Sequence, residues 1–296
     1  TFYTTVGGTK AVSASHELQM AVMIGGIITA FIITLHSLPQ GIGMVDAMYI
    51  AGAHGRLNVV DFSLDWNSRY TFWSGITGGT FLALAYFGTD QSQAQRYISG
   101  QSVRDGRLGL MFNAFFKIPM QFFILLAGVM VFVFYQFQAA PLFFNSHVEK
   151  DILETSAGPA YTQLQKEWKL EHENRQSIYA PVLAGEATYP EKTLMDASVA
   201  KEKALRAEAK VLIEKNLPEV ESNDKDYVFL RFIMDYLPHG FIGLLITTII
   251  AAGMSATASG LNALGATTTV DIYKRLIRKE ASEKHYVIAS KSFTVM

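Results

Sequence analysis

The 296-residue sequence contains no cysteine, which excludes a disulfide framework, a catalytic thiol and Cys-ligated zinc. Its seven histidines are scattered, and no pair has the spacing on one helix that a metal site needs. The HExxH, GxSxG and GxxxxGK[ST] motifs are missing, so we expect no enzyme and no organic cofactor. The formal net charge is −1 and there is no basic tract, which argues against nucleic acid as a partner.

Charge is also scarce in four long hydrophobic stretches, residues 19–38, 71–88, 108–137 and 240–270. Each has about 20 residues or more, the length that crosses a bilayer of about 30 Å as a helix. Backbone groups in hydrocarbon need internal partners, and the ten-residue alternation of a membrane barrel is missing. The sequence therefore predicts an all-α polytopic membrane protein in a lipid bilayer.

The short connections between these stretches carry the basic residues. They are Arg96, Arg104 and Arg107 after the second stretch, and Lys274, Arg275, Arg278, Lys279 and Lys284 after the fourth. The positive-inside rule places these ends in the cytoplasm. We therefore expect a multi-pass protein of the cytoplasmic (inner) membrane, with an outer loop at 39–70 and a long outer segment at 138–235.

This pattern divides the chain into three parts. Residues 1–137 form a membrane part with three helices, and 138–235 form an extracytoplasmic insertion in which 198–216 read as a charged surface helix. Residues 236–296 contain a membrane helix, a cytoplasmic loop and the start of a further helix. The insertion is either a passive cap or a lid that captures substrate. Because the chain starts without Met and ends in an apolar run, we interpret it as an internal fragment.

Residues 251–275 combine an apolar helix with many hydroxyl and amide side chains. At 100° per residue, one face carries Ala252, Ser255, Ser259 and Asn262. Small and hydroxyl residues allow tight packing of membrane helices. The same oxygens suit a hard-cation site for Na⁺ or a path for H⁺. The pattern alone leaves both interpretations open.

Lys117 is the charge that lies deepest in an apolar stretch. It is about nine residues into its helix, roughly 13 Å, which is near the bilayer midplane. A charge there costs at least about 2.5–3.5 kcal/mol, so we expect it to face a partner or a water-filled cavity. Asn113 and Gln121 extend the polar face by one turn on either side, and Pro119 removes a backbone donor. We interpret this face as part of a transport path, with a structural ion pair as the alternative.

The second stretch is short and is interrupted by Gly75, Gly78 and Gly79, so it can unwind around a substrate. Tyr86 and Phe87 follow at its end. The two rings are either an interfacial aromatic belt or a gate that stacks on a solute.

Three segments together resemble the sodium:solute symporter family of sodium–glucose, proline and sialic acid carriers. They read "TVGGTKAV" (5–12), "FGTDQSQAQRYISGQSVRDGRLGLMFNAFFKIP" (87–119) and "AAGMSATASGLNALGATTTVDIYKR" (251–275). The resemblance implies a leucine-transporter-type inverted-repeat helical bundle. This chain would supply core helices 5–8 and the start of 9.

The resemblance also implies a sodium site. Ala252, through its carbonyl, and Ser255 match the principal site on core helix 8, but Ala256 stands where many members have a second hydroxyl. Ser259 matches one ligand of an extra sodium site found in some members. At two other positions of that extra site this chain has Ala258 and His16.

For the solute, the resemblance aligns Tyr86 with an aromatic inner gate and Phe87 with a ring that stacks on substrate. Lys117 aligns with a lysine near the sugar in the sugar carriers, whereas Ala83 stands where those carriers have Asn. With Gln121 on the same polar face as Lys117, these residues are the candidate substrate contacts.

The implied function is a secondary active transporter that couples Na⁺ entry to uptake of a small organic solute, such as a sugar or a carboxylate, by alternating access. Two alternatives remain. One is a proton-coupled or uncoupled carrier of the same fold, which the missing hydroxyl at Ala256 favours. The other is a membrane sensor or receptor input domain.

Overall fold

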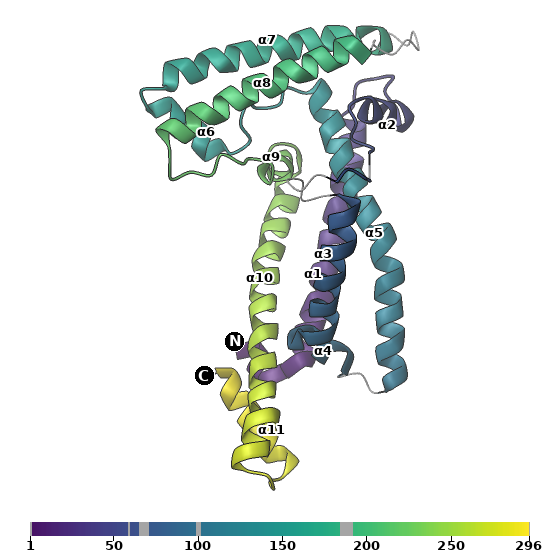
Figure 1. The fold of residues 1–296 in the computed structure, drawn as a ribbon, viewed down its shortest axis with the longest axis vertical. Helices are drawn as coiled ribbons and strands as arrows, with labels where there is room; N and C mark the ends of the chain where they lie inside the picture. The colour runs from purple at the N-terminus through teal and green to yellow at the C-terminus, as the bar shows by residue number, and fades with distance from the viewer. Residues whose placement is uncertain (1, 59, 65–70, 99–101, 184–191, 296) are drawn as a thin grey trace. The chain divides into compact units, whose positions relative to one another are not determined.

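The computed structural model describes residues 2–58, 60–64, 71–98, 102–183 and 192–295, and the regular elements in these ranges are all helical (Figure 1). In chain order they are α1 (Phe2–His36), α2 (Met44–Ala53), α3 (Phe72–Leu84), the π-helix η1 (Ala85–Thr89), α4 (Gln91–Ile98), α5 (Val103–Phe137), α6 (Ser146–Glu154), α7 (Gly158–Leu183), α8 (Lys192–Asn216), α9 (Tyr227–Tyr236), α10 (His239–Thr267), the π-helix η2 (Thr268–Ile277) and α11 (Glu283–Val295).

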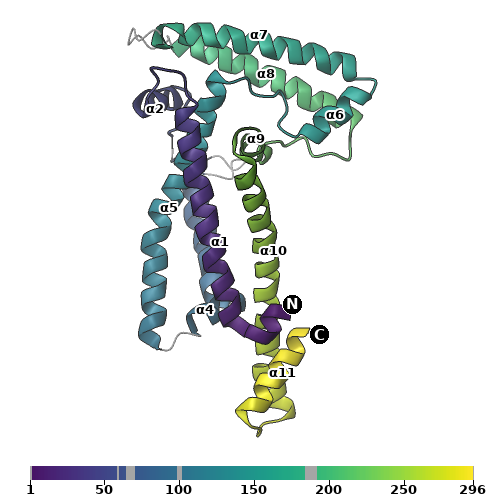
Figure 2. The same ribbon diagram turned by 180° about the vertical axis from the view of Figure 1, so that it is seen from behind.

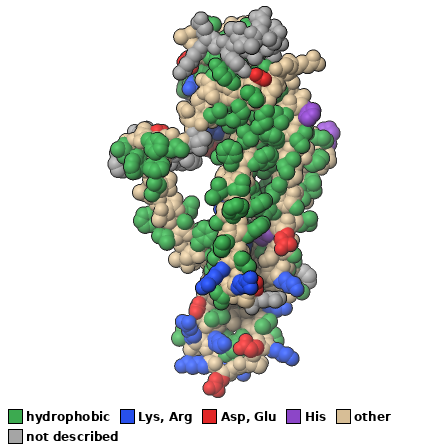
Figure 3. Space-filling view, turned by 90° about the vertical axis from the view of Figure 1, so that its right-hand side faces the viewer, with side chains coloured by type: hydrophobic (Ala, Val, Ile, Leu, Met, Phe, Trp, Pro, Cys, Tyr) green, Lys and Arg blue, Asp and Glu red, His purple; other side chains and the backbone are tan. Residues whose placement is uncertain are grey.

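Within the described residues, three helical segments are long and apolar enough to cross a membrane: Tyr3–His36, Val103–Phe137 and His239–Ile277. The first covers 19–36 of the predicted helix at 19–38, and the other two contain the predicted helices at 108–137 and 240–270. Helix α5 continues through Pro119. Hydrophobic side chains cover much of their surface (Figure 3), as expected for helices that face lipid or neighbouring helices.

The sequence predicts a short membrane helix at 71–88 that can unwind at its glycines, but this stretch is helical through the glycines and changes to a π-helix only at its end. It begins as α3, where Thr71 Oγ1 accepts a hydrogen bond from the Ser74 amide (3.3 Å) and Ser74 Oγ accepts one from the Thr71 amide (3.0 Å). This reciprocal capping fixes the start of the helix. The α-helix then runs through the glycines, and the irregular turn is η1, which contains Tyr86 and Phe87.

The chain forms two compact units. The first unit contains Thr1–Gly26, Val60–Phe122 and Gly243–Met296, and the second contains Ile27–Val59 and Phe123–Ile242. The long helices α1, α5 and α10 each contribute to both units.

In the first unit, α1 and α10 run antiparallel (Figures 1 and 2). Asn262 Nδ2 donates to Thr9 Oγ1 (3.3 Å), and a Cβ placed on Gly26 would lie 2.6 Å from Leu245 Cδ2. The two contacts are 17 residues apart on both helices, so they define one register. At Gly8 the φ angle is 57°, which bends the first turns of α1 away from the helix axis.

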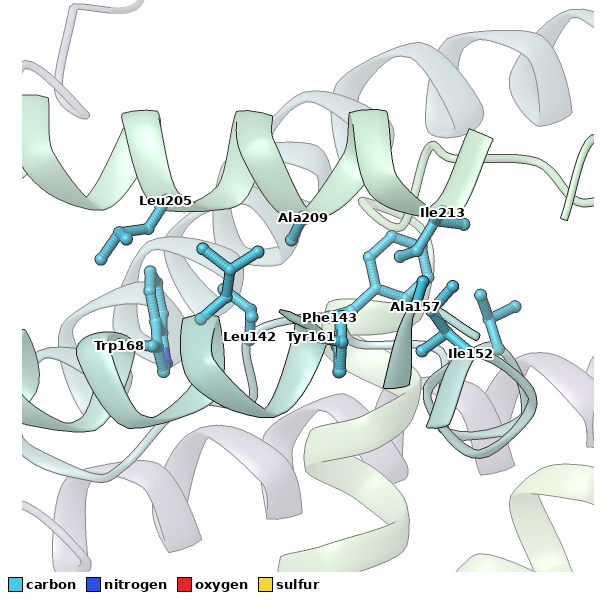
Figure 4. Close-up of a cluster of buried hydrophobic side chains, with 11 residues drawn as sticks. Leu142, Phe143, Ile152, Ala157, Tyr161, Trp168, Leu205, Ala209 and Ile213 are labelled. Carbon is cyan, nitrogen blue, oxygen red and sulfur yellow. The ribbon is translucent and has the colours of Figure 1, made fainter. Parts of the chain in front are cut away.

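The second unit is built on an antiparallel pair, α7 and α8, with α6 against both (Figure 1). Apolar side chains from these helices and from the α5–α6 connection form one of the buried apolar clusters of this unit, shown in Figure 4. The cluster contains Leu142, Phe143, Val148, Ile152, Ala157, Tyr161, Leu164, Trp168, Leu205, Ala209 and Ile213. Trp168 also donates to the Ala140 carbonyl (2.7 Å), which ties α7 to the residues that follow α5.

Buried carboxylates fix the edges of this core. Asp224 is fully buried, forms ion pairs with Arg206 and Lys210, and accepts the Phe144 amide at 3.0 Å. Glu171 on α7, 1% exposed, lies 2.8 Å from Lys201 Nζ on α8. The predicted surface helix at 198–216 is the larger part of α8, and one of its faces is buried in this packing.

Candidate functional site

The predicted cation ligands lie on the buried face of α10. Ser255 is 1% exposed, and its Oγ has no hydrogen-bond partner. Ser259, one turn further on, is also buried, and Ala252 is half-buried. A buried hydroxyl without a partner is costly, so Ser255 Oγ is an oxygen available to a ligand.

A second unpartnered oxygen lies on α1 and was not anticipated. Gln19 is buried, and its Oε1 has no hydrogen-bond partner. Val12, Gln19 and Gly26 are buried at seven-residue intervals on one face of α1. Counting seven residues back from Gly26 and seven forward from Leu245 puts Gln19 opposite Ala252 in the antiparallel register.

These groups are neutral oxygens, the ligand type that hard cations such as Na⁺ accept. Among the described residues, no group of three or more His, Asp or Glu is placed to hold a metal ion. The donor set of Ser255 Oγ, Gln19 Oε1 and the Ala252 carbonyl therefore suits a monovalent hard cation better than a transition metal.

Ser259 has a different environment from Ser255. Arg96 Nη2, on α4, lies 3.4 Å from Ser259 Oγ and 3.2 Å from His16 Nε2 on α1. The guanidinium thus lies beside Ser259 and His16. These are two positions of the extra sodium site that some members of the family have. A positive charge at this distance opposes a second cation there, and the role of Ser259 as a sodium ligand stays a prediction.

The neighbouring residue on α4 strengthens this junction. Gln95 Oε1 accepts a hydrogen bond from Asn262 Nδ2 at 3.3 Å, and the same nitrogen donates to Thr9. Side chains of α4 thus bond to both α1 and α10. In the sequence, Arg96 is recognisable only as an orientation signal, because His16 and Ser259 lie 80 and 163 residues away.

A cavity of about 380 Å³ lies beside α4 in the first unit. It is lined by Tyr86, Phe87, Gln93, Arg96, Tyr97, Asp105, Gly106, Gly109, Leu110 and Asn113. The Tyr86 and Phe87 rings meet edge to face with centroids 5.0 Å apart, and Tyr97 Oη donates to the Phe87 carbonyl (2.9 Å). The wall thus combines two aromatic rings with polar and charged groups, as small-solute sites do.

The structure brings three of the four predicted substrate residues together. Lys117 Nζ lies 5.9 Å from the centroid of the Tyr86 ring, and Tyr86 is next to Phe87 in η1. Lys117 and Gln121 are exposed and are not part of the cavity lining, whereas Asn113 is. Gln121 lies one turn beyond Lys117 on α5, and its role as a substrate contact stays a prediction.

Comparison with known proteins shows similarity to sodium-coupled transporters. The family model of the sodium:solute symporter family matches residues 204–296. The human sodium/iodide cotransporter is 34% identical over 135 residues, which are 46% of this chain and 20% of that protein. Bovine sodium-coupled monocarboxylate transporter 2 is 40% identical over 113 residues, 38% of this chain and 18% of that protein. The chain thus spans about a fifth of the length of these relatives.

Among solved structures, the substrate-bound, outward-open state of a Na⁺-coupled sialic acid symporter matches with a TM-score of 0.59 and 18% identity. The match covers 99% of this chain and 45% of that one, and it confirms the leucine-transporter-type helical fold. The relatives are transporters, which agrees with the expectation that this protein is not an enzyme, and they support a multi-pass membrane location. In sequence, residues 204–296 are similar to the sodium:solute symporter family, whose model they match.

Proposed function

We propose that this chain is part of a secondary active transporter in which Na⁺ entry drives uptake of a small solute by alternating access. The observation that carries the proposal is the buried, unpartnered Ser255 Oγ on α10, at the position that the family resemblance assigns to a sodium ligand. Sodium can drive transport only through different affinities for the outward-open and inward-open states. A site whose ligands come from two helices can have a different affinity for sodium in each of these states.

The proposed Na⁺ ligands within this chain are Ser255 Oγ, the Ala252 carbonyl and Gln19 Oε1. Ala256 is exposed and has no hydroxyl, so it contributes no ligand. Gln19 supports the proposal because its buried amide oxygen lies on the facing helix at the level of Ala252. An oxygen from α1 would then take the place of the one missing at Ala256.

We propose a small anion as the solute. The charged groups near the two aromatic rings include the cations Lys117, 5.9 Å from the Tyr86 ring, and Arg96 in the cavity wall. Two relatives with sequence similarity to this chain carry iodide and monocarboxylate in their names. A sugar has less support, because Ala83 offers no hydrogen-bonding group.

We further propose that the end of the first unit with η2 and α11 faces the cytoplasm, in a cytoplasmic membrane. Lys and Arg side chains gather at this end (Figure 3), and the basic residues between Lys274 and Lys284 are exposed there. The positive-inside rule supports this orientation.

The test is uptake of radiolabelled iodide and propionate into proteoliposomes with an inward Na⁺ gradient, compared with equimolar K⁺. We expect Na⁺-dependent accumulation of at least one of these anions that falls at least tenfold in Ser255→Ala. Thr257→Val is the matched control, because Thr257 is exposed on the same helix and its hydroxyl bonds only the Gly253 carbonyl (3.0 Å).

Three outcomes would contradict the proposal. Uptake that is equal in Na⁺ and K⁺ and collapses with a proton uncoupler would show a proton-coupled carrier. Uptake that is equal in both and resists the uncoupler would show an uncoupled carrier. Binding of Na⁺ and anion without any accumulation would favour a sensor.

A further inference from the structure

One side chain touches both parts of the candidate site. Arg96 Nη2 lies 3.4 Å from Ser259 Oγ, and Ser259 is one helical turn beyond Ser255 on α10. The same arginine lines the cavity that Tyr86 and Phe87 border. No residue of the cavity wall other than Arg96 has a hydrogen bond to α10 among those the structure describes.

The hydrogen bonds of Arg96 define a position for its charge. A guanidinium has donors but no acceptor, so both Ser259 Oγ and His16 Nε2 accept from it. His16 is then the neutral tautomer with its proton on Nδ1. These two hydrogen-bond acceptors are neutral, and Arg96 also interacts electrostatically with the carboxylate of Asp90.

We propose that Arg96 couples the cation site to the solute cavity by moving between two positions, one anchored on Ser259 and His16 and one turned into the cavity. The inference rests on the proposed function. A cation bound at Ser255 repels the guanidinium one turn away and favours the cavity position. There the charge attracts an anion, and by reciprocity an anion in the cavity strengthens cation binding.

Because the same wall contains a carboxylate, movement of Arg96 changes the electrostatic potential in the cavity. Asp105 lines the cavity and accepts a hydrogen bond from Ser102 Oγ (2.8 Å). Its negative charge opposes an anion as long as Arg96 stays anchored on α10. Movement of Arg96 into the cavity offsets that charge, so the potential in the cavity reports the position of Arg96.

The test measures this potential with a thiol reporter and needs no identified solute. Gly109→Cys places the thiol in the cavity wall, where an added Cβ meets no heavy atom within 4 Å. The printed sequence has no cysteine, so a background free of other cysteines isolates the reporter. The ratio of labelling rates for an anionic and a cationic methanethiosulfonate reagent is measured in NaCl and in KCl.

We expect Na⁺ to raise the anionic-to-cationic ratio at least threefold when Arg96 is present, and to leave it unchanged in Arg96→Gln. Arg107→Gln is the matched control, since Arg107 is exposed near the start of α5 and should leave the Na⁺ response intact. Ser259→Ala removes one anchor and keeps the charge, so it should raise the ratio already in KCl. This variant tests the proposal even if Arg96→Gln does not fold.

An unchanged ratio in the Arg96 protein, or an equal Na⁺ response in Arg96→Gln, would overturn the coupling role. Either result is separable from failure of the proposed function. A protein that accumulates solute with Na⁺ and loses this in Ser255→Ala keeps its function while the role of Arg96 is rejected.

Discussion

The ammonium nitrogen of Lys117 lies 5.9 Å from the centroid of the Tyr86 ring, within the range of a cation–π contact. The two residues come from α5 and η1 and meet within the first unit. The contact places a cation beside the aromatic pair that borders the cavity.

Replacing Lys117 should therefore change solute affinity more than stability. We expect Lys117→Met to raise the KM for an anionic solute about tenfold, the equivalent of about 1.4 kcal/mol, because one charge–anion interaction is lost. Lys117→Arg keeps the charge and should restore most of the affinity. The check is uptake kinetics together with the melting temperature. An unchanged KM with a lowered melting temperature would mean that Lys117 is a packing residue.

The contact of Gly26 with Leu245 predicts a matched pair of substitutions on α1. A Cβ at Gly26 would lie 2.6 Å from Leu245 Cδ2, whereas a Cβ at Gly25 meets nothing within 4 Å. Gly26→Val should destabilise the protein by about 1–3 kcal/mol through overpacking, and Gly25→Val should have little effect. Adding Leu245→Ala should recover part of the loss. Equal melting temperatures for the two glycine variants would contradict this packing of α1 on α10.

Asp224 anchors the core of the second unit. It is fully buried and paired with Arg206 and Lys210, so Asp224→Asn should cost about 3 kcal/mol by leaving these cations without their partner. Asp235→Asn is the control, because its i,i+4 pair with Arg231 is half-exposed and worth only about 0.3–0.5 kcal/mol. Thermal unfolding of the two variants should separate them clearly, and similar melting temperatures would argue against a buried ion-pair anchor.

His54 should make stability depend on pH. Its Nε2 lies 2.7 Å from Tyr179 Oη, and burial, followed by the charges of Arg175 and Arg56, lowers its pKa to about 4. In the unfolded chain the pKa is about 6.5, so between pH 4 and 6.5 the unfolded state binds more protons. The contribution of neutral His54 to the free energy of unfolding is therefore complete above about pH 6.5 and is lost as the pH falls towards 4. His54→Gln should flatten the melting temperature in this window, and an unchanged pH slope would exclude His54 as its source.

The sequence predicted the long helices well because length and hydropathy are enough for them. The apolar runs in α1, α5 and α10 reach membrane length with almost no charge. It did not predict η1, because a π-turn within an apolar stretch has no compositional signal. The face of α10 that carries Ser255 followed from helical spacing, whereas the ligand role of Ser255 stays a prediction.

The junction of α1, α4 and α10 could not be predicted in this way. Arg96 meets His16 and Ser259 across 80 and 163 residues, and only tertiary packing brings them together. Gln19 did carry a signal, since it is seven residues from both Val12 and Gly26 on one face of α1. A polar residue at regular spacing within a buried apolar face is a site candidate, and the spacing alone would have found it.

The most direct test of a sodium site at Ser255 is the melting temperature of the purified protein in NaCl against equimolar KCl, for the wild type, Ser255→Ala and Thr257→Val. A ligand at 100 times its Kd should stabilise the folded state by about 2.7 kcal/mol. We predict a Na⁺-selective rise in the wild type and in Thr257→Val that is missing in Ser255→Ala. Equal melting temperatures of the wild type in the two salts, or a full rise in Ser255→Ala, would contradict a sodium site at this hydroxyl.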